Sequence, residues 1–319
     1  MRAIVTYVKE FLREQWNAPY IAAVGLILGV LFLLNYRFDL ETSITSRLPH
    51  PLVLTGFYFV FFSVPYFLTH IAYAIAKKDF VILHQHQFWL LSLFCLSVLS
   101  VYIALHDLPR YILNNHPFIF EIVPSELQRF VARCLSNVIP LVVAGVPLIS
   151  YWRRVDRREM PLYGFSAKTI KLRTYFLLLL FLLPLVVGVS LTGDFQAAYP
   201  RYKFGFPEHT MGMEKGAFVG VFQLCYGSDF VFVEFFFRGF MVLAFTRLLG
   251  TRAIIPMVVV YALIHFEKPL LEALSSIVGG LVLGVISYRT KSIYGGIILH
   301  LGIAYMMEIA GTLQMVPRQ

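Results

Sequence analysis

The stretch DFVFVEFFFRGF, residues 229–240, places two acids and an arginine among phenylalanines and valines. It lies within a longer apolar segment, residues 216–246, which exceeds the roughly 20 residues that a helix needs to cross a bilayer core. Ionisable side chains inside a membrane span are costly, and they usually face the protein interior or a water-filled cavity. Asp229, Glu234 and Arg238 are therefore the first candidates for a functional site.

The composition indicates an integral membrane protein. Of the 319 residues, 58% are hydrophobic and 14% are charged, whereas a soluble domain carries about 25% charged residues. The net charge of +9 is typical of Lys and Arg in cytoplasmic loops, and the short basic runs argue against nucleic-acid binding. Cys95, Cys134 and Cys225 fall within apolar segments and indicate small hydrophobic residues, with neither a disulfide framework nor a metal site.

The hydrophobic pattern predicts nine membrane spans. They are residues 19–36, 52–76, 87–105, 130–151, 174–192, 216–246, 253–266, 271–288 and 292–313. The polar run CYGSDF, residues 225–230, interrupts the sixth span, and the count falls to eight if residues 253–288 form a re-entrant unit. The expected fold class is all-α, a polytopic membrane helical bundle of eight or nine transmembrane helices.

The Lys and Arg residues predict the orientation. The loop 152–173 contains seven of them, and the segment before residue 19 is basic and amphipathic, with no evident cleavable signal peptide. Both regions lie inside if the N-terminus is cytoplasmic. We therefore expect a multi-pass protein of the cell (inner) membrane, with the lipid bilayer as a partner.

The chain changes character near residue 214. Residues 1–213 are predicted to form N-terminal transmembrane helices with the basic loop, and residues 214–319 to form the helices that carry the ionisable residues of the later spans. The run SSIVGGLVLG, residues 275–284, contains Gly279, Gly280 and Gly284, which suit close helix contact.

Two histidines extend the set of intramembrane polar residues. Glu234 and Arg238 are spaced i, i+4, so their side chains can meet, either as a structural ion pair or as a reactive carboxylate oriented by the guanidinium. His265 ends the span 253–266, and His300 lies within the last span. Each histidine alone is typical of a hydrogen-bonded residue, but a carboxylate and two histidines on three spans can transfer protons or bind zinc.

Other catalytic signatures do not occur in the sequence. It contains no HExxH zinc helix and no GxSxG nucleophile motif. The run YGSD, residues 226–229, has no second aspartate within an apolar span with which to form an aspartyl pair. The run HQH, residues 84–86, is typical of a solvated pair at the membrane interface.

Three motifs occur in a defined order: VEFFFRG at 233–239, YALIH at 261–265 and HLGIA at 300–304. They are similar to the EExxxR, FxxxH and HxxxN/D motifs of the CPBP family, intramembrane proteases that include CAAX endopeptidases. The resemblance covers residues 217–308. It implies that a carboxylate and His265 activate water, that His300 stabilises the oxyanion or completes a metal site, and that Arg238 orients Glu234.

The chain departs from this family pattern at two functional positions. Val233 occupies the place of the first glutamate, which the family is expected to use to activate water, and Ala304 occupies the place of the asparagine. Asp229, one helical turn before Val233, or Glu267, two residues after His265, could supply the missing carboxylate. Alternatively, Asp229 faces a polar cavity, and Glu267 belongs to a solvated helix end.

Three functions remain open from the sequence. The first is an intramembrane endopeptidase that hydrolyses a membrane-associated peptide or protein; its candidate catalytic residues are Glu234, Arg238, His265, His300 and Asp229. Glu234, His265 and His300 are the candidate zinc ligands. The second is a pseudoprotease that binds a membrane protein or lipidated peptide. The third is a proton-coupled transporter, against which the lack of an inverted repeat counts.

Overall fold

The computed structural model describes residues 2–48, 50–116, 123–168, 170–203, 207, 212 and 214–315. Every regular element in these ranges is a helix, as the predicted fold class requires. The elements are α1 (Arg2–Gln15), α2 (Ala18–Phe38), α3 (Leu40–Thr45), α4 (Pro51–Lys77), η1 (Val81–His84), α5 (His86–Leu105), α6 (Leu108–Asn115), α7 (Ser125–Tyr151), η3 (Trp152–Asp156), η4 (Leu162–Gly164), α8 (Leu172–Ser190), α9 (Gly193–Ala198), α11 (Lys215–Glu234), η5 (Phe235–Ala244), α12 (Thr246–Leu249), η6 (Gly250–Ala253), α13 (Ile254–Leu263), α14 (Leu270–Thr290) and α15 (Tyr294–Met315).

The described ranges contain nine helical segments that are long and apolar enough to cross a membrane, which confirms the nine predicted spans. The seventh runs through Thr246–Leu263 as α12, η6 and α13. Its last helix, α13, has 10 residues and is therefore about 15 Å long, half the thickness of the bilayer core. Residues 253–288 form two separate helices, α13 and α14, and the re-entrant alternative stays a prediction.

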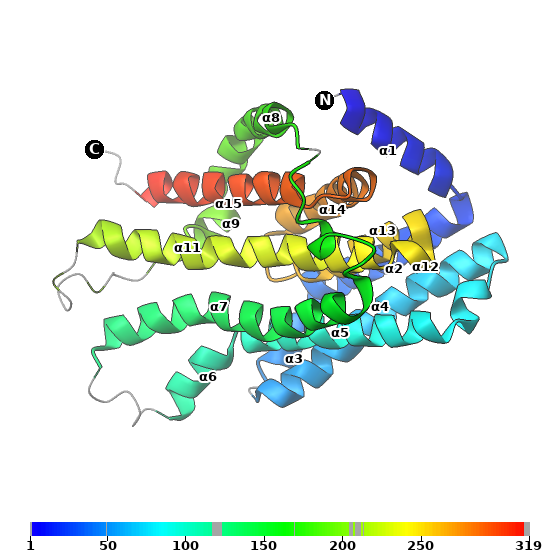
Figure 1. Ribbon diagram of the computed structural model, residues 1–319. Coiled ribbons are helices and arrows are strands. Elements are labelled where there is room, and N and C mark those ends of the chain that lie inside the picture. The colour runs from blue at the N-terminus through cyan, green and yellow to red at the C-terminus, as the bar shows by residue number, and fades with distance from the viewer. Residues whose placement is uncertain are drawn as a thin grey trace.

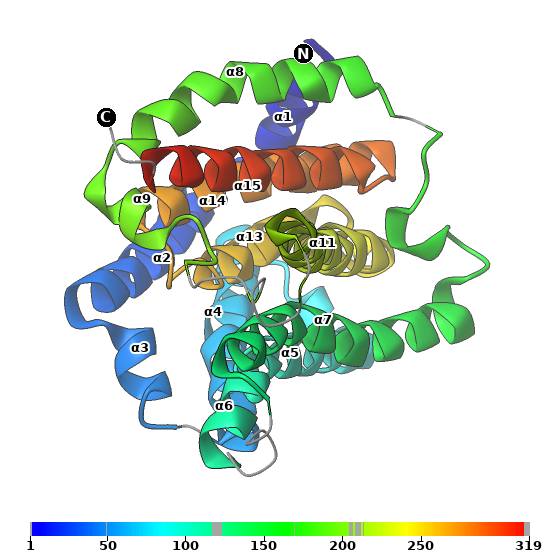
Figure 2. The ribbon, with the colours of Figure 1, turned by 90° about the vertical axis from the view of Figure 1, so that its left-hand side faces the viewer.

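The centre of the bundle is formed by the segments that carry the predicted site. All residues of η5 and α13 are buried. Figure 2 shows α11 and α13 in the middle, with α14 and α15 on one side and α4, α5 and α7 on the other. The helix α8 lies at the outside against α15. Charges on η5 therefore face protein rather than lipid.

The expected interruption of the sixth span at residues 225–230 is wrong. The helix α11 runs unbroken through this polar run to Glu234. Within the helix, the hydroxyl of Ser228 donates a hydrogen bond to the backbone carbonyl of Cys225. The departure from α-helical geometry comes later, where η5 continues the span as a π-helix. Such wider turns occur frequently at functional sites.

Close helix contact occurs at two of the three predicted glycines. A Cβ on Gly280 would lie 2.9 Å from the Tyr261 ring, and one on Gly284 would lie 2.7 Å from Met257, so α14 packs closely on α13 through these positions. Gly279 has open space instead, and its predicted contact is wrong. Adjacent residues on a helix point about 100° apart, so Gly279 faces away from α13.

The basic loop after α7 is fixed to α12, which follows η5. The carboxylate of Asp156 is fully buried, lies 3.0 Å from the guanidinium of Arg247, and accepts a hydrogen bond of 2.9 Å from the hydroxyl of Tyr163. One apolar core extends from Phe11 to Ile293. Side chains from both predicted parts of the chain, 1–213 and 214–319, therefore pack in the same core.

The candidate site and the basic loop lie toward opposite ends of the bundle. Because the spans alternate in direction, the loops after α2, α5, α8 and α13 share one end, and the N-terminus and the basic loop share the other (Figure 1). The predicted site residue His265 lies in the loop after α13. If the N-terminus is cytoplasmic, as the Lys and Arg bias predicts, this site opens on the opposite side.

Cysteine labelling tests this orientation. In a background with Cys225 replaced by alanine, we expect Arg110→Cys to react with an impermeant maleimide in intact cells and Arg158→Cys to react only after the cells are broken. Both side chains are exposed, and Cys95 and Cys134 are buried. The reverse pattern would place the N-terminus outside.

Candidate functional site

The predicted ion pair forms at the junction of α11 and η5. The Oε1 atom of Glu234 lies 3.0 Å from Nη1 of Arg238, and neither residue has any exposed surface. The guanidinium also lies over the ring of Tyr261, 4.0 Å from its centroid. The two opposite charges compensate each other in a site from which water is excluded, which is what a buried charge requires.

His300 is oriented by the same carboxylate. Its Nδ1 atom lies 3.0 Å from Oε1 of Glu234. Because an ionised carboxylate can only accept, Nδ1 donates the hydrogen, and the lone pair of the neutral ring is on Nε2. The hydroxyl of Tyr261 lies 3.5 Å from this Nε2 atom. Glu234 and Arg238 thus fix one tautomer of His300, although 66 residues separate His300 from Glu234.

Gly296 allows α15 to approach the ion pair. It lies one turn before His300, and a Cβ at this position would collide with Oε2 of Glu234. The absence of a side chain therefore permits the contact between α15 and α11 that brings His300 to Glu234.

His265 presents the same tautomer by a different interaction. Its Nδ1 atom lies 2.8 Å from the backbone carbonyl of Tyr261. A carbonyl only accepts, so Nδ1 carries the hydrogen and Nε2 carries the lone pair. Burial, together with the nearby positive charges of Lys268 and Arg238, lowers the pKa of His265 to about 3, and the ring is neutral at physiological pH.

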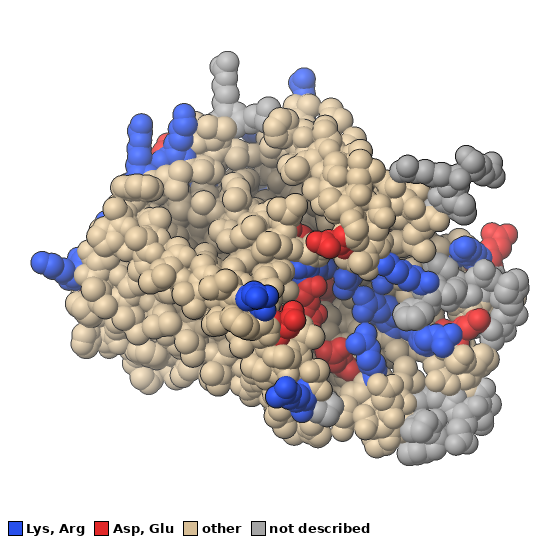
Figure 3. Space-filling model, turned by 180° about the vertical axis from the view of Figure 1, so that it is seen from behind, with Lys and Arg blue, Asp and Glu red and all other residues tan. Residues whose placement is uncertain are grey.

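The two histidines line one cavity of about 580 Å³, together with Asp229, Val233 and Glu267. This volume lies within the range of about 300–1,000 Å³ that is common for ligand pockets. Lys, Arg, Asp and Glu side chains gather in and around a hollow on one face of the molecule, which is otherwise mostly uncharged (Figure 3). Glu234 has no exposed surface, so its carboxylate acts on the cavity through His300.

The two departures from the family pattern lie in different surroundings. Val233 lines the cavity with only 6% of its surface exposed. A carboxylate at this position would face the same space as the histidines. Ala304 packs in an apolar cluster with Phe222 and Tyr226 and has 4% of its surface exposed.

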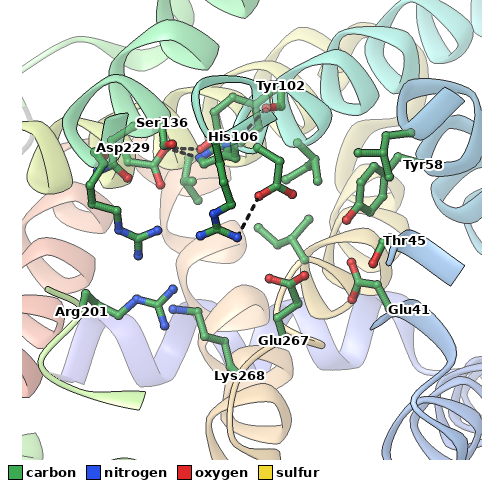
Figure 4. A pocket seen from close by; sticks show the side chains of 18 of the residues that line it. Glu41, Thr45, Tyr58, Tyr102, His106, Ser136, Arg201, Asp229, Glu267 and Lys268 are labelled. Carbon is green, nitrogen blue, oxygen red and sulfur yellow. Dashed lines mark hydrogen bonds and ion pairs between the residues drawn. The ribbon is translucent and has the colours of Figure 1, made fainter. Parts of the chain in front are cut away.

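Asp229 has partners that the sequence interpretation missed. It accepts a hydrogen bond from the hydroxyl of Tyr102, and Nε2 of His106 lies 3.3 Å from its Oδ1 atom (Figure 4). The Nδ1 atom of His106 lies 3.0 Å from the carbonyl of Tyr102. Both ring nitrogens therefore face acceptors, and only the doubly protonated imidazolium can donate to both. Burial opposes this charge, but Asp229 outweighs it and raises the pKa of His106.

A sequence signal for this cluster existed. The run YIALH, residues 102–106, repeats the Tyr-to-His spacing of YALIH, residues 261–265, at the end of another span. In both runs the histidine Nδ1 atom faces the carbonyl four residues earlier. The sequence could not show that His106 would meet Asp229, 123 residues away.

Glu267 is exposed and lies beside Glu41 in the cavity (Figure 4). Burial and the nearby charge of Glu267 raise the pKa of Glu41 to about 8, although a hydrogen bond with Tyr58 opposes this shift. Glu267 is thus the cavity carboxylate nearest to His265 in sequence, and it lies next to a second carboxyl group.

The zinc expectation stays a prediction. Among the described residues, no three or more His, Cys, Asp or Glu side chains form a group that could hold a metal ion. Of the three candidate ligands, His265 and His300 line the cavity, whereas Oε1 of Glu234 faces Nδ1 of His300 and Arg238. The three side chains therefore do not fit a common zinc centre, and no step below uses one.

One known protein family matches the part of the chain that contains Glu234, Arg238, His265 and His300. Residues 220–306 match the family of Rce1-like type II CAAX prenyl endopeptidases. The match confirms the resemblance of this segment to CPBP and CAAX proteases, and such a family suggests intramembrane protease activity. The matched segment contains the ion pair, His265 and His300, whereas His106 and Tyr102 lie outside it. No curated protein and no solved structure matches the chain.

The close approach at Gly296 can be tested by substitution. We expect Gly296→Ala to cost about 1–3 kcal/mol in the free energy of unfolding, because the added methyl group overpacks the ion pair. Gly279→Ala is the matched control: it faces open space, and alanine is the better helix former there. Denaturant titrations in detergent would measure both. Equal stability of the two variants would contradict the packing described here.

The charge on His106 predicts a pH dependence of stability. Because its pKa is raised above the ordinary value of 6.5, its ionisation stabilises the folded protein fully below pH 6.5, and this contribution is lost as the pH rises through the raised pKa. We expect the wild-type melting temperature to fall more between pH 6 and pH 9 than that of His106→Gln. The exposed His84→Gln variant should behave as wild type. A parallel pH dependence in all three proteins would rule out the imidazolium.

Proposed function

We propose that the protein is an intramembrane endopeptidase in which His300, oriented by Glu234, is the general base. The observation that carries this proposal is the 3.0 Å contact between Glu234 and Nδ1 of His300, which leaves the lone pair on Nε2, where the only hydrogen-bonding neighbour among the described residues is the Tyr261 hydroxyl at 3.5 Å. The substrate is a membrane-associated peptide or protein. The match of residues 220–306 to the CAAX endopeptidases supports the reaction class.

The chemistry follows from the two tautomers. Nε2 of His300 takes a proton from a water molecule as the oxygen attacks the carbonyl carbon of the peptide bond. The resulting imidazolium is stabilised by Glu234, and it returns the proton to the leaving nitrogen as the C–N bond breaks. His265 is neutral and can accept the second hydrogen of the same water through its own Nε2 atom, which orients the water.

This assignment changes the roles that the family resemblance implies. The sequence interpretation gave the base to a carboxylate, with Glu234, Asp229 or Glu267 in place of the missing glutamate. Asp229 is occupied by Tyr102 and His106, so we assign it a charge-pairing role. Arg238 compensates the charge of Glu234 and does not reach the cavity itself.

A pseudoprotease is the second candidate, and one observation favours it. Val233 lines the cavity at the position where the family pattern has its first glutamate, so the wall beside the two histidines is apolar there. In this case the cavity binds a membrane protein or lipidated peptide without hydrolysis.

Reconstituted protein and a fluorogenic membrane peptide test the assignment. We expect His300→Ala to lower the rate of hydrolysis by about 10²–10⁴-fold, the usual contribution of a general base. Glu234→Gln should also lower it strongly, because it loses the stabilisation of the imidazolium. Asp229→Asn is the control that separates our assignment from a carboxylate base, and it should retain most of the activity.

Two outcomes would contradict the assignment. Loss of activity in Asp229→Asn with retention in His300→Ala would make Asp229 the base. No hydrolysis by the wild-type protein, with hydrolysis gained in a Val233→Glu, Ala304→Asn double variant, would identify a pseudoprotease.

A further inference from the structure

Four Lys and Arg side chains line the same cavity as the two histidines. Arg110 lies 3.6 Å from Asp107, and the other three come from outside the helices that form the ion pair. Arg133 belongs to α7, Arg201 follows α9, and Lys268 lies in the loop before α14. Figure 4 shows the side chains of Arg201 and Lys268 pointing toward each other into the pocket, with Glu41 and Glu267 on the other side. Arg110 and His106 of the cavity lining pair with Asp107 and Asp229, whereas Arg201 and Lys268 face each other.

The two arginines have no ion-pair partner among the described residues. The acids near them have other partners. Asp107, whose charge acts on Arg133, lies 3.6 Å from Arg110, and the two acids that contact the segment 199–201 are also engaged. Glu308 accepts hydrogen bonds from the backbone N–H of Arg201, at 2.7 Å, and from the side chain of Gln223, at 3.2 Å. Oε1 of Glu272 accepts a hydrogen bond of 3.0 Å from the hydroxyl of Tyr199, and the Nζ atom of Lys268 lies 3.8 Å from the same oxygen.

The positions of these cations are fixed by the surrounding structure. The hydroxyl of Tyr199 is bound by Glu272 on α14, and the backbone of Arg201 is bound by Glu308 on α15, so the segment 199–201 is held at both ends. The Nε atom of Arg201 is buried and has no hydrogen-bond partner among the described residues. Burial and repulsion from Arg201 lower the pKa of Lys268 to about 8, which agrees with like charges that face each other.

We propose that Arg133, Arg201 and Lys268 bind a carboxylate of the substrate, so that the enzyme prefers acidic peptides. This inference rests on the proposed peptidase function, because it places the anion in the cavity that holds His265 and His300. Guanidinium groups bind carboxylates with two parallel hydrogen bonds, and they do so more strongly in a partly buried site than in water. A single anionic group would compensate the repulsion among three clustered cations.

The carboxylate has two sources in a peptide. It is either the C-terminal carboxylate, if the cleaved bond lies near the end of the chain, or the side chain of an Asp or Glu near that bond. Both sources share the chemistry that the cations recognise, so the test includes one peptide for each.

Binding measurements on the full-length protein in nanodiscs of phosphatidylcholine test the proposal. The probe is a fluorescent apolar hexapeptide in three forms: with a free C-terminal carboxylate, with a C-terminal amide, and with a C-terminal amide and one internal Asp. We expect at least one carboxylate form to bind about 10- to 100-fold more tightly than the amide, the range of a charge-assisted contact. The form that gains affinity identifies the source.

Protein variants then localise the effect. Arg201→Gln and Arg133→Gln should remove the preference for the carboxylate and leave the affinity for the amide peptide unchanged. Arg110→Gln is the matched control: it also removes one positive charge from the cavity lining, but Arg110 lies 3.6 Å from Asp107 and is largely exposed. It should keep the preference. Because amidation changes only the peptide, the comparison remains valid if a protein variant fails to fold.

Three results would overturn the proposal. The first is equal binding of all three peptides by the wild-type protein. The second is that Arg110→Gln loses the preference for the carboxylate peptide as fully as Arg201→Gln and Arg133→Gln do. The third is loss of this preference when phosphatidylglycerol replaces phosphatidylcholine, which would assign the cations to a lipid phosphate. The outcome is independent of catalysis. Carboxylate-dependent binding without hydrolysis would support this site and reject the peptidase. Hydrolysis of the three peptides without preference would support the peptidase and reject the carboxylate site.

Discussion

The structure around the candidate site depends on the buried ion pair between Glu234 and Arg238. Removing one partner of such a pair leaves an uncompensated charge in a low dielectric, at a cost of about 3–5 kcal/mol. The pair therefore constrains its neighbours. The ring of Tyr261 covers the guanidinium, Gly296 leaves room for the carboxylate, and His300 donates to it. Three helices are thus packed around one charge pair, and the oriented histidine is a consequence of that packing.

The cavity contains two Tyr-to-His pairs whose local geometry is alike and whose charge states differ. In both, the histidine Nδ1 atom faces the backbone carbonyl four residues earlier. The second nitrogen of His106 faces Asp229, whereas that of His265 faces a cavity with positive charges nearby. The first ring is therefore an imidazolium, and the second is neutral. A side chain on a different helix decides which of these two states the same motif adopts.

The segment that matches the CAAX endopeptidases forms only part of the cavity. Residues 220–306 supply the ion pair, His265 and His300. The cations Arg133 and Arg201 and the partners of Asp229 come from the chain before this segment. The matched segment accordingly contains the groups suited to chemistry, and the preceding helices contribute the charges that a ligand would meet.

The sequence by itself determined the features that depend on local spacing or on the bilayer. Apolar segments of membrane length predicted nine spans, because a helix must satisfy its own backbone in lipid. The i, i+4 spacing predicted the contact of Glu234 with Arg238. Tertiary structure decided what depends on helix packing: which face of α14 meets α13, that Glu234 contacts His300, and that Asp229 pairs with His106. These contacts join residues 66 and 123 positions apart. The physical reason is that the period of a helix fixes the relation between neighbours along it, whereas the rotation of each helix about its axis is set by packing against the others.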